Sequence, residues 1–411
     1  MAENVKTVIV GGGIWGLSTA YHLARAGHAD VYVLERNEEL FSETTSQAAG
    51  LVGQIRSTSL MREAIRYAID LFSRFEQDTG YDPGFRQVGS LLIALTPERM
   101  KPFEEQVEHA NKNGVEARFV DPAEMAKLAP ALDASQVLGG YFIPKDGYLD
   151  PVRCAQAYAA AAKDQGVKAR TGAQVTGLSV HDGRVAGVET ERGLIEADHV
   201  VVTAGPWSTL ITKMVGFIPP MQPIRHQRVT TVPVEGMPNH HPVVRVTDAS
   251  CYVRPERGGY LYGYFEPNPV SYDLEALSPE FSTADIEAPV EIMAEARDRL
   301  GPIFPVLKEL EVAEYKRGLT TFAPDGNYLV GPVPEIENLY VATGCAALGI
   351  AGSAAVGRWL ANWATTGDPG EDLSQVNLER FGDRASDRNW VRQTSEEFYG
   401  AYYSIASMSV T

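Results

Sequence analysis

The sequence predicts an α/β fold (α+β overall), in which a Rossmann-like dinucleotide-binding domain carries an inserted domain with a mixed sheet. Three observations predict this fold. A β-branched run at residues 7–10 leads into a glycine-rich turn and then a helical pattern. A nearly all-apolar run at 198–205 is typical of a strand buried on both faces of a parallel sheet. Between Pro219 and Pro305 the pattern changes to alternating strands and one long helix.

The glycine-rich turn has the spacing of a dinucleotide-binding motif. Gly11, Gly13 and Gly16 satisfy G-x-G-x-x-G between a predicted strand and a predicted helix. Gly11 permits the tight turn, Gly13 lets a pyrophosphate approach the backbone, and Gly16 lets helix and strand pack closely. Glu35 ends the second strand, where its carboxylate can accept hydrogen bonds from a ribose but repels a 2′-phosphate. The motif therefore favours FAD or NAD over NADP.

Composition restricts the partners and the location. The chain has 411 residues, enough for two or three units, of which 44% are hydrophobic and 22% charged. A formal charge of −17 disfavours nucleic acids and anionic membranes. Three widely spaced cysteines argue against disulfides and against a metal site. Because neither a signal sequence nor a long apolar run is present, we expect no membrane span and a cytoplasmic location.

The remaining elements follow in chain order. After Glu35, a polar loop at 42–47 and small apolar residues at 48–53 would let the backbone approach a flat ligand, with a merely flexible loop as the alternative. Asp150 is a good N-cap for the next helix. We predict helices over 61–79, 97–113, 152–166, 285–300 and 350–366, and strands over 88–95, 168–170, 175–181, 184–191, 194–197, 198–205, 226–232, 251–254, 260–265 and 339–342.

Several separate segments carry a resemblance to one family. They are the first βαβ unit and residues 45–51, 146–151, 203–207, 224–227, 254–266, 325–326 and 344–360. Through them, nearly the whole chain resembles the FAD-dependent amine oxidoreductases of the D-amino-acid oxidase group, and most closely the flavin portion of dimethylglycine and sarcosine dehydrogenases. Those dehydrogenases continue into a folate-binding domain, whereas this sequence stops at Thr411. We therefore expect no built-in acceptor for a one-carbon unit, and free release of any formaldehyde.

The resemblance implies a domain division and a set of cofactor contacts. We assign residues 1–80, 145–215 and 320–380 to a discontinuous FAD-binding domain, 81–144 and 216–319 to a substrate-binding domain, and 381–411 to a C-terminal extension. The predicted FAD contacts are Gly11, Gly13, Ile14, Trp15, Gly16, Glu35, Arg36, Thr44, Thr45, Ser46, Gln47, Ala49, Gly50, Leu51, Val175, Ala204, Gly205, Trp207, Gly331, Gly344, Leu348, Gly349 and Ile350.

Three departures from the family pattern change what is expected. Gln47 stands where the resembling dehydrogenases have a His that bonds covalently to the flavin, so we predict noncovalent FAD. Residues 344–350 lack the Arg that holds a carboxylate in amino-acid oxidases of the group. The strand ending in Tyr264 lacks the oxygen-activating Lys of monomeric sarcosine oxidases. Arg56 resembles a carboxylate-binding Arg of sarcosine oxidases, with a surface or phosphate contact as the alternative.

The catalytic candidates are His226, Arg56 and Tyr264. His226 matches the family position facing the flavin, and a group titrating near neutrality is a natural proton acceptor; a buried structural His is the alternative. Tyr264, with Tyr252 and Tyr260, is a candidate for an aromatic wall around an ammonium, with ordinary sheet packing as the alternative. Backbone amides at 348–350 are expected to meet negative charge on the reduced flavin.

The expected reaction is oxidation of a secondary or tertiary amine or amino acid, carrying an N-methyl group, to an iminium that hydrolyses to an aldehyde and the dealkylated amine. One alternative is an oxidase of a primary amino acid of the glycine or D-amino-acid type. Another is a flavin-binding subunit of a larger amine dehydrogenase complex. A single fingerprint disfavours an NAD(P)-linked reductase. The expected electron acceptor is O2 or an electron-transfer protein, and oligomerisation stays open.

Overall fold

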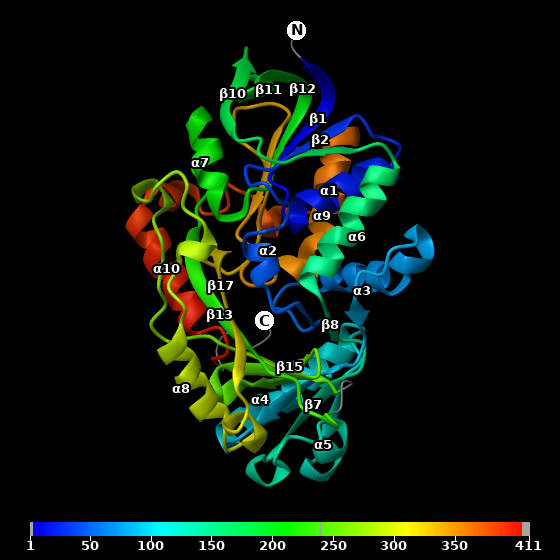
Figure 1. The fold of residues 1–411 in the computed structure, drawn as a ribbon, viewed down its shortest axis with the longest axis vertical. Coiled ribbons are helices and arrows are strands. Elements are labelled where there is room, and N and C mark those ends of the chain that lie inside the picture. Colours follow the sequence, from blue (N-terminus) through cyan, green and yellow to red (C-terminus); the bar gives the residue numbers. More distant parts are fainter. Residues whose placement is uncertain (1–2, 238–240, 405–411) are drawn as a thin grey trace.

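The chain folds around two large β-sheets. The structure is a computed structural model, and it describes residues 3–237 and 241–404. In Figure 1 the sheet built around β1 lies at the top, with helices beside it, and the second sheet lies below. The predicted α/β class with an additional mixed sheet is confirmed. Ile405 to Thr411, the end of the predicted C-terminal extension, lies outside the described residues.

The upper sheet has a parallel centre. β1 (Glu3–Val10) pairs in parallel with β2 (Val31–Leu34) and with β12 (Gly193–Val202). β2 pairs in parallel with β9 (Lys168–Arg170), and β12 with β19 (Leu339–Thr343). The two predicted strands at 194–197 and 198–205 are one long strand, β12, which pairs with β1 from Ile195 to Val202. Its first half also pairs with β11 (Arg184–Thr190) on the other side. The carboxyl ends of β1, β2 and β12 meet at one edge, where open α/β sheets bind ligands.

Helices cover this sheet and fix its edge. α1 (Ile14–Arg25) packs between α6 (Pro151–Asp164) and α9 (Gly349–Thr366), and all three lie on the same side of the sheet in Figure 1. Asp150 caps α6 as predicted, accepting hydrogen bonds from the amides of Val152 and Arg153. α3 (Ser59–Thr79) packs on α9 below them.

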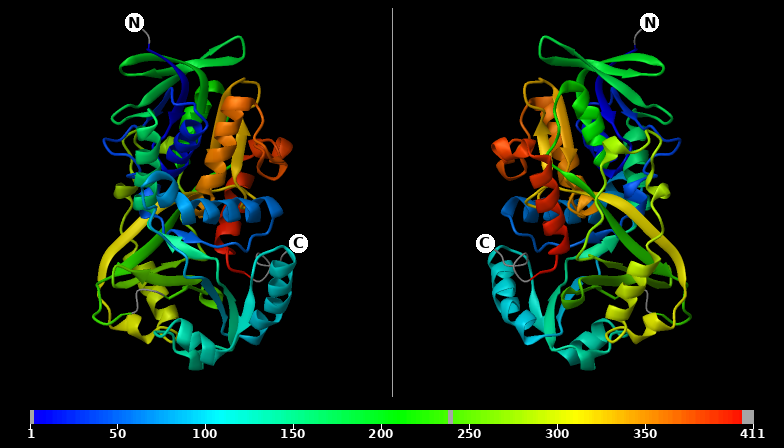
Figure 2. Two further views of the ribbon diagram at one scale, coloured as in Figure 1. Left: turned by 90° about the vertical axis from the view of Figure 1, so that its right-hand side faces the viewer. Right: turned by 90° about the vertical axis from the view of Figure 1, so that its left-hand side faces the viewer.

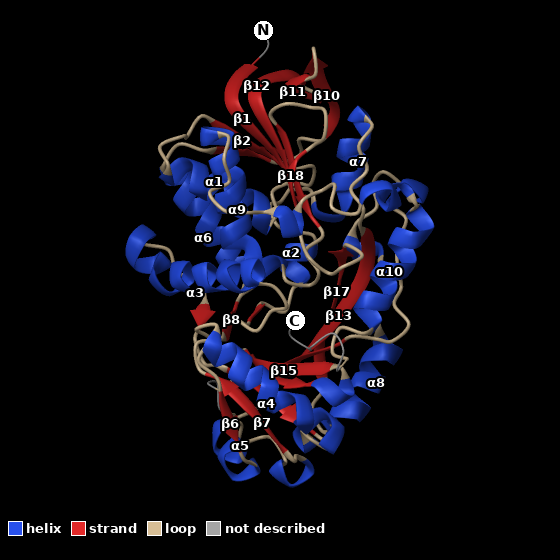
Figure 3. Cartoon of the chain, turned by 180° about the vertical axis from the view of Figure 1, so that it is seen from behind, coloured by secondary structure: helices blue, strands red, loops and turns tan. Residues whose placement is uncertain are grey.

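The lower sheet has eight strands in the order β17-β13-β16-β15-β14-β5-β7-β6. Most neighbours are antiparallel, but β14 (Val243–Val246) runs parallel to β5 (Ser90–Ala94), so the sheet is mixed. β13 (Gln222–Thr231) and β17 (Val312–Phe322) pair along nearly their whole length. These two strands rise from the lower sheet toward the upper one, as Figures 2 and 3 show. They therefore form one wall of the space between the sheets.

The other elements complete the chain. They are α2 (Thr44–Gln47), β3 (Leu51–Val52), β4 (Phe85–Arg86), α4 (Pro97–Lys112), β6 (Arg118–Val120), α5 (Pro122–Leu128), β7 (Gly139–Ile143), β8 (Gly147–Leu149), β10 (Val175–His181), α7 (Ser208–Thr212), β15 (Cys251–Glu256), β16 (Gly259–Tyr264), α8 (Val290–Leu300), β18 (Leu329–Pro332) and α10 (Arg388–Gly400), with short 3-10 turns between them. Within the described residues, no helix is both long and apolar enough to cross a membrane.

The structure contains several elements that the prediction lacks. They include β6, α5, β7, β14, β17 and α10, and β17 is the longest strand of the lower sheet. The helix expected from residue 285 begins at Val290, because Pro289 forces residue 288 out of the helical region. The predicted domain boundaries stay a prediction.

We predict that any side chain at position 357, where α9 crosses α1, destabilises the protein. A β-carbon at Gly357 would lie 2.3 Å from Ser18 Oγ and 2.7 Å from the Ser18 carbonyl carbon. Gly357→Ala should therefore lower the free energy of unfolding by about 1–3 kcal/mol, measured by urea denaturation. Gly331→Ala is the matched control, since its nearest neighbour would be 3.7 Å away. Equal stability of the two variants would show that the helices separate easily.

Candidate active site

A cavity of about 320 Å³ lies between the carboxyl edge of the parallel sheet and the lower sheet. Its floor comes from the ends of β1 and β2 and from the turns that follow β1, β2 and β12. Its opposite side comes from β13, β14, β15 and β17. The cavity thus joins segments that are far apart in the sequence.

The glycine-rich turn forms one end of the cavity. Gly11 has φ 110°, and a β-carbon there would lie 2.7 Å from the Thr203 carbonyl oxygen, so only glycine fits. Gly13 lines the cavity at the N-terminus of α1, where the Ile14 amide donates to Thr45 Oγ1 at 3.1 Å. Gly16 does not line the cavity but packs against the Gly11 carbonyl, as its predicted packing role requires. The open helix N-terminus suits an anionic phosphate.

Glu35 and Arg36 lie beyond this turn. The Glu35 carboxylate accepts hydrogen bonds from the amides of Gly12 and Asn37, each at 2.9 Å. Burial raises the pKa of Glu35 above its usual value, and these hydrogen bonds oppose the rise. The Arg36 guanidinium stacks over the Trp207 ring, 4.4 Å from its centre. All three side chains line the cavity.

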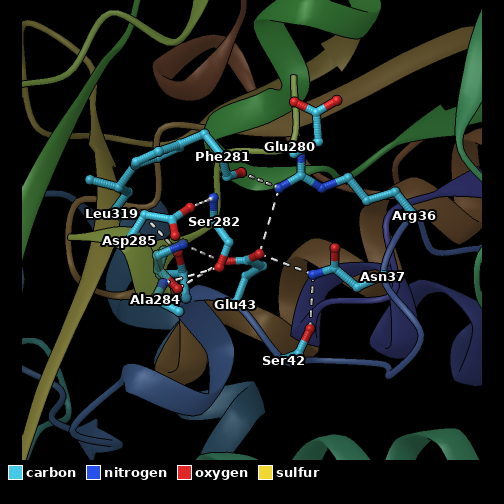
Figure 4. Close-up of polar contacts among 12 residues, drawn as sticks. Arg36, Asn37, Ser42, Glu43, Glu280, Phe281, Ser282, Ala284, Asp285 and Leu319 are labelled. Carbon is cyan, nitrogen blue, oxygen red and sulfur yellow. Dashed lines mark hydrogen bonds and ion pairs between the residues drawn. The ribbon is translucent and has the colours of Figure 1, made fainter. Parts of the chain in front are cut away.

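A surface segment at 279–286 covers this end of the cavity through polar contacts, shown in Figure 4. Arg36 Nη2 donates to the Phe281 carbonyl at 2.7 Å and lies 3.5 Å from Glu43 Oε1. Glu43 Oε2 accepts hydrogen bonds from the amide and the hydroxyl of Thr283, at 2.9 and 2.7 Å. Arg36 and Glu43 therefore join this segment to the nucleotide side of the cavity.

The loop at 44–51 is held by two arginines of the lower sheet. Arg228 Nε donates to the Gln47 carbonyl, and Arg254 Nε to the Ala49 carbonyl, each at 2.9 Å. Burial lowers the pKa of Arg228 to about 10, and neighbouring Arg254 adds to the effect. The side chain of Ser46 turns away from the cavity and donates to the carbonyls of residues 42 and 43. The loop backbone, rather than the Ser46 hydroxyl, therefore faces the cavity.

The turn before α9 brings backbone amides to the cavity. Ala346 and Ala347 have φ of 46° and 58°, a conformation that non-glycine residues rarely adopt. Two threonines of β17 fix the turn, since Thr321 Oγ1 accepts from the Cys345 amide and Thr320 Oγ1 from the Ala347 amide, each at 2.9 Å. Leu348, Gly349 and Ile350 follow at the start of α9 and line the cavity.

His226 lies on the lower-sheet side, between two tyrosines. Its Nδ1 is 2.9 Å from the Tyr399 hydroxyl and its Nε2 is 3.0 Å from the Tyr252 hydroxyl. The Phe265 ring packs on it, 4.4 Å between ring centres. Burial, with a smaller contribution from nearby Arg228, lowers the pKa of His226 to about 3. The imidazole is therefore neutral at physiological pH and, alone, a weak proton acceptor, and its catalytic role stays a prediction beside the structural alternative.

Arg56 and Arg245 bring positive charge to the same cavity. Within the described residues neither forms an ion pair, and Nε of each guanidinium is buried without a hydrogen-bond partner, as is Nη2 of Arg56. The one hydrogen bond of the Arg56 side chain goes to the carbonyl of the preceding residue. Asp146, near Arg245, already accepts hydrogen bonds from Gln54 and Ser90. One buried cation, Arg245, and one partly buried cation, Arg56, thus face the cavity with unused donors.

The structure brings most predicted site residues together. Among the predicted FAD contacts, those lining the cavity are Gly11, Gly13, Ile14, Trp15, Glu35, Arg36, Thr44, Thr45, Gln47, Ala49, Gly50, Leu51, Val175, Ala204, Gly205, Trp207, Leu348, Gly349 and Ile350. Gly16, Ser46, Gly331 and Gly344 do not line it. Gly331 faces Trp363 and Leu378, while Gly344 provides a turn with φ 67°.

Tyr264 is wrongly placed by the sequence-based hypothesis, and so is Tyr260. Strand alternation puts both on the face of β16 opposite the cavity. The Tyr264 hydroxyl contacts Glu295 Oε1 of α8 at 3.0 Å. Tyr252 is the one member of the predicted aromatic wall that lines the cavity, and its ring occupies the space over Gly263.

Sequence reasoning missed Arg245 and the tyrosines of the C-terminal segment. Arg245 interrupts an otherwise apolar run, Val-Val-Arg-Val, and a charge inside a buried strand is a signal that could have identified it. Tyr402 and Tyr403 line the cavity, and Tyr402 stacks on Phe265 at 4.1 Å. Cys345 also lines the cavity, whereas Cys154 and Cys251 are buried in the core, and all three thiols are free.

Comparison with known families gives the chain its place. Residues 6–363 match the family described as FAD dependent oxidoreductase, and residues 366–407 match the FAD dependent oxidoreductase central domain. This chain belongs to the FAD-dependent oxidoreductases. It is 33% identical over 406 residues to dimethylglycine dehydrogenase of Rattus norvegicus, covering 97% of this chain and 47% of that protein. It is also 33% identical to 4-methylaminobutanoate oxidase (formaldehyde-forming) of Paenarthrobacter nicotinovorans, covering 98% and 49%.

The chain spans about half the length of these curated relatives. Among solved structures, L-proline dehydrogenase from P. horikoshii is similar, with a TM-score of 0.84 and 26% identity over 93% of this chain and 98% of that one. Glycine oxidase from Geobacillus kaustophilus has a TM-score of 0.80 at 22% identity, over 92% and 99%, which shows the fold alone. The FAD-dependent oxidoreductase resemblance predicted from the sequence is confirmed.

The cavity residues fit FAD. Gly11 and Gly13 leave backbone rather than side chains at the N-terminus of α1, which suits the pyrophosphate. Glu35 would hold the ribose, and the small residues of the loop at 44–51 leave room for a flat ring.

We predict that FAD is held without a covalent bond, because Gln47 offers no nucleophile to the ring. Acid precipitation of the yellow protein should release the flavin into the supernatant, measured by absorbance. Flavin that stays in the pellet would contradict this. Cys345→Ser, which removes the one cysteine lining the cavity, would then test whether that thiol forms the bond.

We predict that Glu35→Arg weakens FAD binding more than folding. Reversing this charge removes acceptors for the ribose without opening a cavity in the core, and should raise the dissociation constant of FAD by about 10- to 100-fold. The flavin-to-protein ratio after gel filtration and the melting temperature of the apoprotein measure the two effects. Glu39→Arg is the control, since that residue is exposed. Full flavin occupancy in Glu35→Arg would contradict the ribose contact.

Proposed function

We propose that this chain oxidises a secondary or tertiary amine that carries a carboxylate, such as an N-methyl amino acid. The amine becomes an iminium, and water converts the iminium to an aldehyde and the dealkylated amine. The observation that carries the proposal is the pair of guanidinium groups, Arg56 and Arg245, that face the cavity and form no ion pair with any residue that the structure describes. The relatives support it, since dimethylglycine, 4-methylaminobutanoate and proline are all N-substituted amino acids.

A carboxylate supplies what these arginines lack. A buried cation that is unpaired costs several kcal/mol, of the order measured when one partner of a buried pair is removed, about 3–5 kcal/mol. Carboxylate oxygens can accept the unused donors of Arg56 and Arg245 in short, charge-assisted hydrogen bonds. The arginine that amino-acid oxidases of the group place near Ala347 is replaced here by these two, on the loop after β3 and on β14.

The same positive charge favours a neutral amine. Hydride loss from the carbon next to nitrogen needs the nitrogen lone pair, so the ammonium must first lose its proton. Two guanidinium groups nearby lower the pKa of a bound ammonium, because like charges disfavour the protonated form. The proton can then leave to solvent, and the weak basicity of His226 is no obstacle.

The chain's other residues orient the substrate and exclude water. Phe265 and Tyr402 form a stacked aromatic pair at the substrate end of the cavity. Tyr252 presents a hydroxyl beside them. FAD, when bound, supplies the acceptor for the hydride. The C–H bond breaks as the C=N bond forms, after which water adds to the C=N carbon and the C–N bond breaks.

Two further attributes belong to this proposal. The substrate is a small-molecule amine, and the electrons pass to O2 or to an electron-transfer protein. Oxidation of a primary amino acid is the competing function. The panel of substrates below decides between the two.

We predict that N-methylglycine, N,N-dimethylglycine or proline bleaches the flavin anaerobically, whereas dimethylamine and trimethylamine, which lack the carboxylate, do not. Arg56→Gln should reduce the rate of bleaching at subsaturating substrate by about 100-fold, as expected for one partner of a buried ion pair. Stopped-flow absorbance measures both. Bleaching by glycine or D-alanine alone would contradict the substrate class. Equal rates with the decarboxylated amines would contradict the role of the arginines.

A further inference from the structure

One segment closes the nucleotide end of the cavity. It comprises residues 273–289, between β16 and α8, and we call it the cover segment. Pro279, near its middle, lines the cavity. Figure 4 shows the segment beside Arg36 and Glu43, which also line the cavity. The segment therefore lies over the part of the cavity where Glu35 is expected to hold the ribose of FAD.

The backbone of the cover segment is attached to little else. Within the described residues, each backbone–backbone hydrogen bond of 273–289 stays inside the segment or joins it to α8. Leu274 and Ile286, near its two ends, are buried in one small apolar cluster. Glu275 adds an ion pair to Lys213 at 2.8 Å. The middle of the segment is thus held by side chains rather than by pairing with a strand.

Charged side chains from outside the segment make these middle contacts. Arg36 Nη2 donates to the Phe281 carbonyl at 2.7 Å. Glu43 Oε2 accepts from the amide and the hydroxyl of Thr283, at 2.9 and 2.7 Å. Arg317 of β17 donates to two carbonyls closer to α8, at 2.8 and 2.7 Å. The nucleotide side of the cavity therefore holds one part of the segment, and the lower sheet holds the part that leads into α8.

Glu43 connects the cover segment to the residues expected to bind FAD. Its other carboxylate oxygen, Oε1, accepts from Asn37 Nδ2 at 3.0 Å and lies 3.5 Å from Arg36 Nη2. The Asn37 amide donates to Glu35 Oε1 at 2.9 Å. Glu43 also directly precedes α2, which belongs to the loop that faces the cavity. A cofactor that orders Glu35 and α2 would therefore hold Glu43 where it binds Thr283.

We propose that the cover segment opens to admit and release FAD, and that Glu43 is the positioning residue that keeps it closed once FAD is bound. The middle of the segment moves away when its contacts with Arg36 and Glu43 break. The end nearest α8 stays in place, because Arg317 and the buried Ile286 hold it. The inference concerns exchange of the cofactor, so it goes beyond the proposed oxidation and does not depend on which amine is oxidised.

The rate of FAD release tests the closing contacts. Glu43→Gln loses the charge and one of the two acceptor oxygens, and should raise the rate constant of FAD dissociation by about 10-fold. Thr283→Val loses the hydroxyl and keeps the backbone amide, and should raise it by about 3-fold. Flavin fluorescence, which increases when FAD leaves the protein, follows the release after dilution. The melting temperature of each apoprotein separates this effect from a loss of folding. Unchanged dissociation in both variants would overturn the proposal.

Glu280→Gln is the matched control. Glu280 is an exposed acid on the same segment, and its carboxylate accepts from the Ser278 hydroxyl within that segment. This variant should therefore release FAD at the rate of the unaltered protein. If Glu280→Gln and Glu43→Gln accelerate release equally, then the loss of negative charge alone explains the effect and the assigned role of Glu43 is wrong.

Backbone hydrogen exchange measures the opening itself. In the apoprotein, amides in the middle of 273–289 should exchange faster than in the FAD-bound protein, whereas amides of α8 should not change. FAD-bound Glu43→Gln should exchange at a rate between these two. Equal exchange with and without FAD would overturn the opening, whatever the release rates are. Because neither measurement uses an amine, both results stand or fall separately from the proposed function.

Discussion

Buried guanidinium groups hold the two sides of the cavity together. Arg228 and Arg254 extend from the lower sheet and donate to the carbonyls of Gln47 and Ala49. Because a charge removed from water needs hydrogen-bond partners, these arginines are stable only where the loop at 44–51 presents its backbone oxygens. The loop is therefore fixed relative to the lower sheet. The same contacts keep the loop's small residues facing the space where a flat ring has to fit.

Arg56 and Arg245 differ from these two arginines in their hydrogen-bond partners. Arg245 is as buried as Arg228, Arg56 is partly buried, and both lack equivalent partners in the described part of the chain. The rest of the fold compensates for the free energy lost by burying these donors without partners. A carboxylate bound in the cavity would restore that free energy. A site arranged in this way binds an anion tightly and at the same time disfavours a second positive charge. Both properties would serve the proposed oxidation, in which a carboxylate is bound and the amine has to lose its proton.

How far the sequence predicts this structure depends on whether the signal is local. The strand-turn-helix unit around Gly11 and the capped helix after Asp150 were predicted because their causes lie within a few residues. β17 was missed because it contains Glu314, Lys316 and Arg317, which are poor strand formers but suit an edge strand. Tyr264 was misplaced because the alternation of side chains along a strand separates its two faces but does not show which face meets the cavity. The role of Arg245 could be inferred only once the fold placed it in the wall of the cavity.

The C-terminal helix shows why family boundaries and physical units need not agree. The match to the first family ends at residue 363, and α10 falls within the second match, 366–407. Yet α10 packs on β13 and β17, and its Tyr399 contacts His226 in the interior. Asp387, which caps α10 by accepting from two backbone amides, places this helix so that the hydroxyl reaches the ring. The wall of the cavity around His226 is therefore built from both matched regions, since Tyr402 and Tyr403 of the second line it as well.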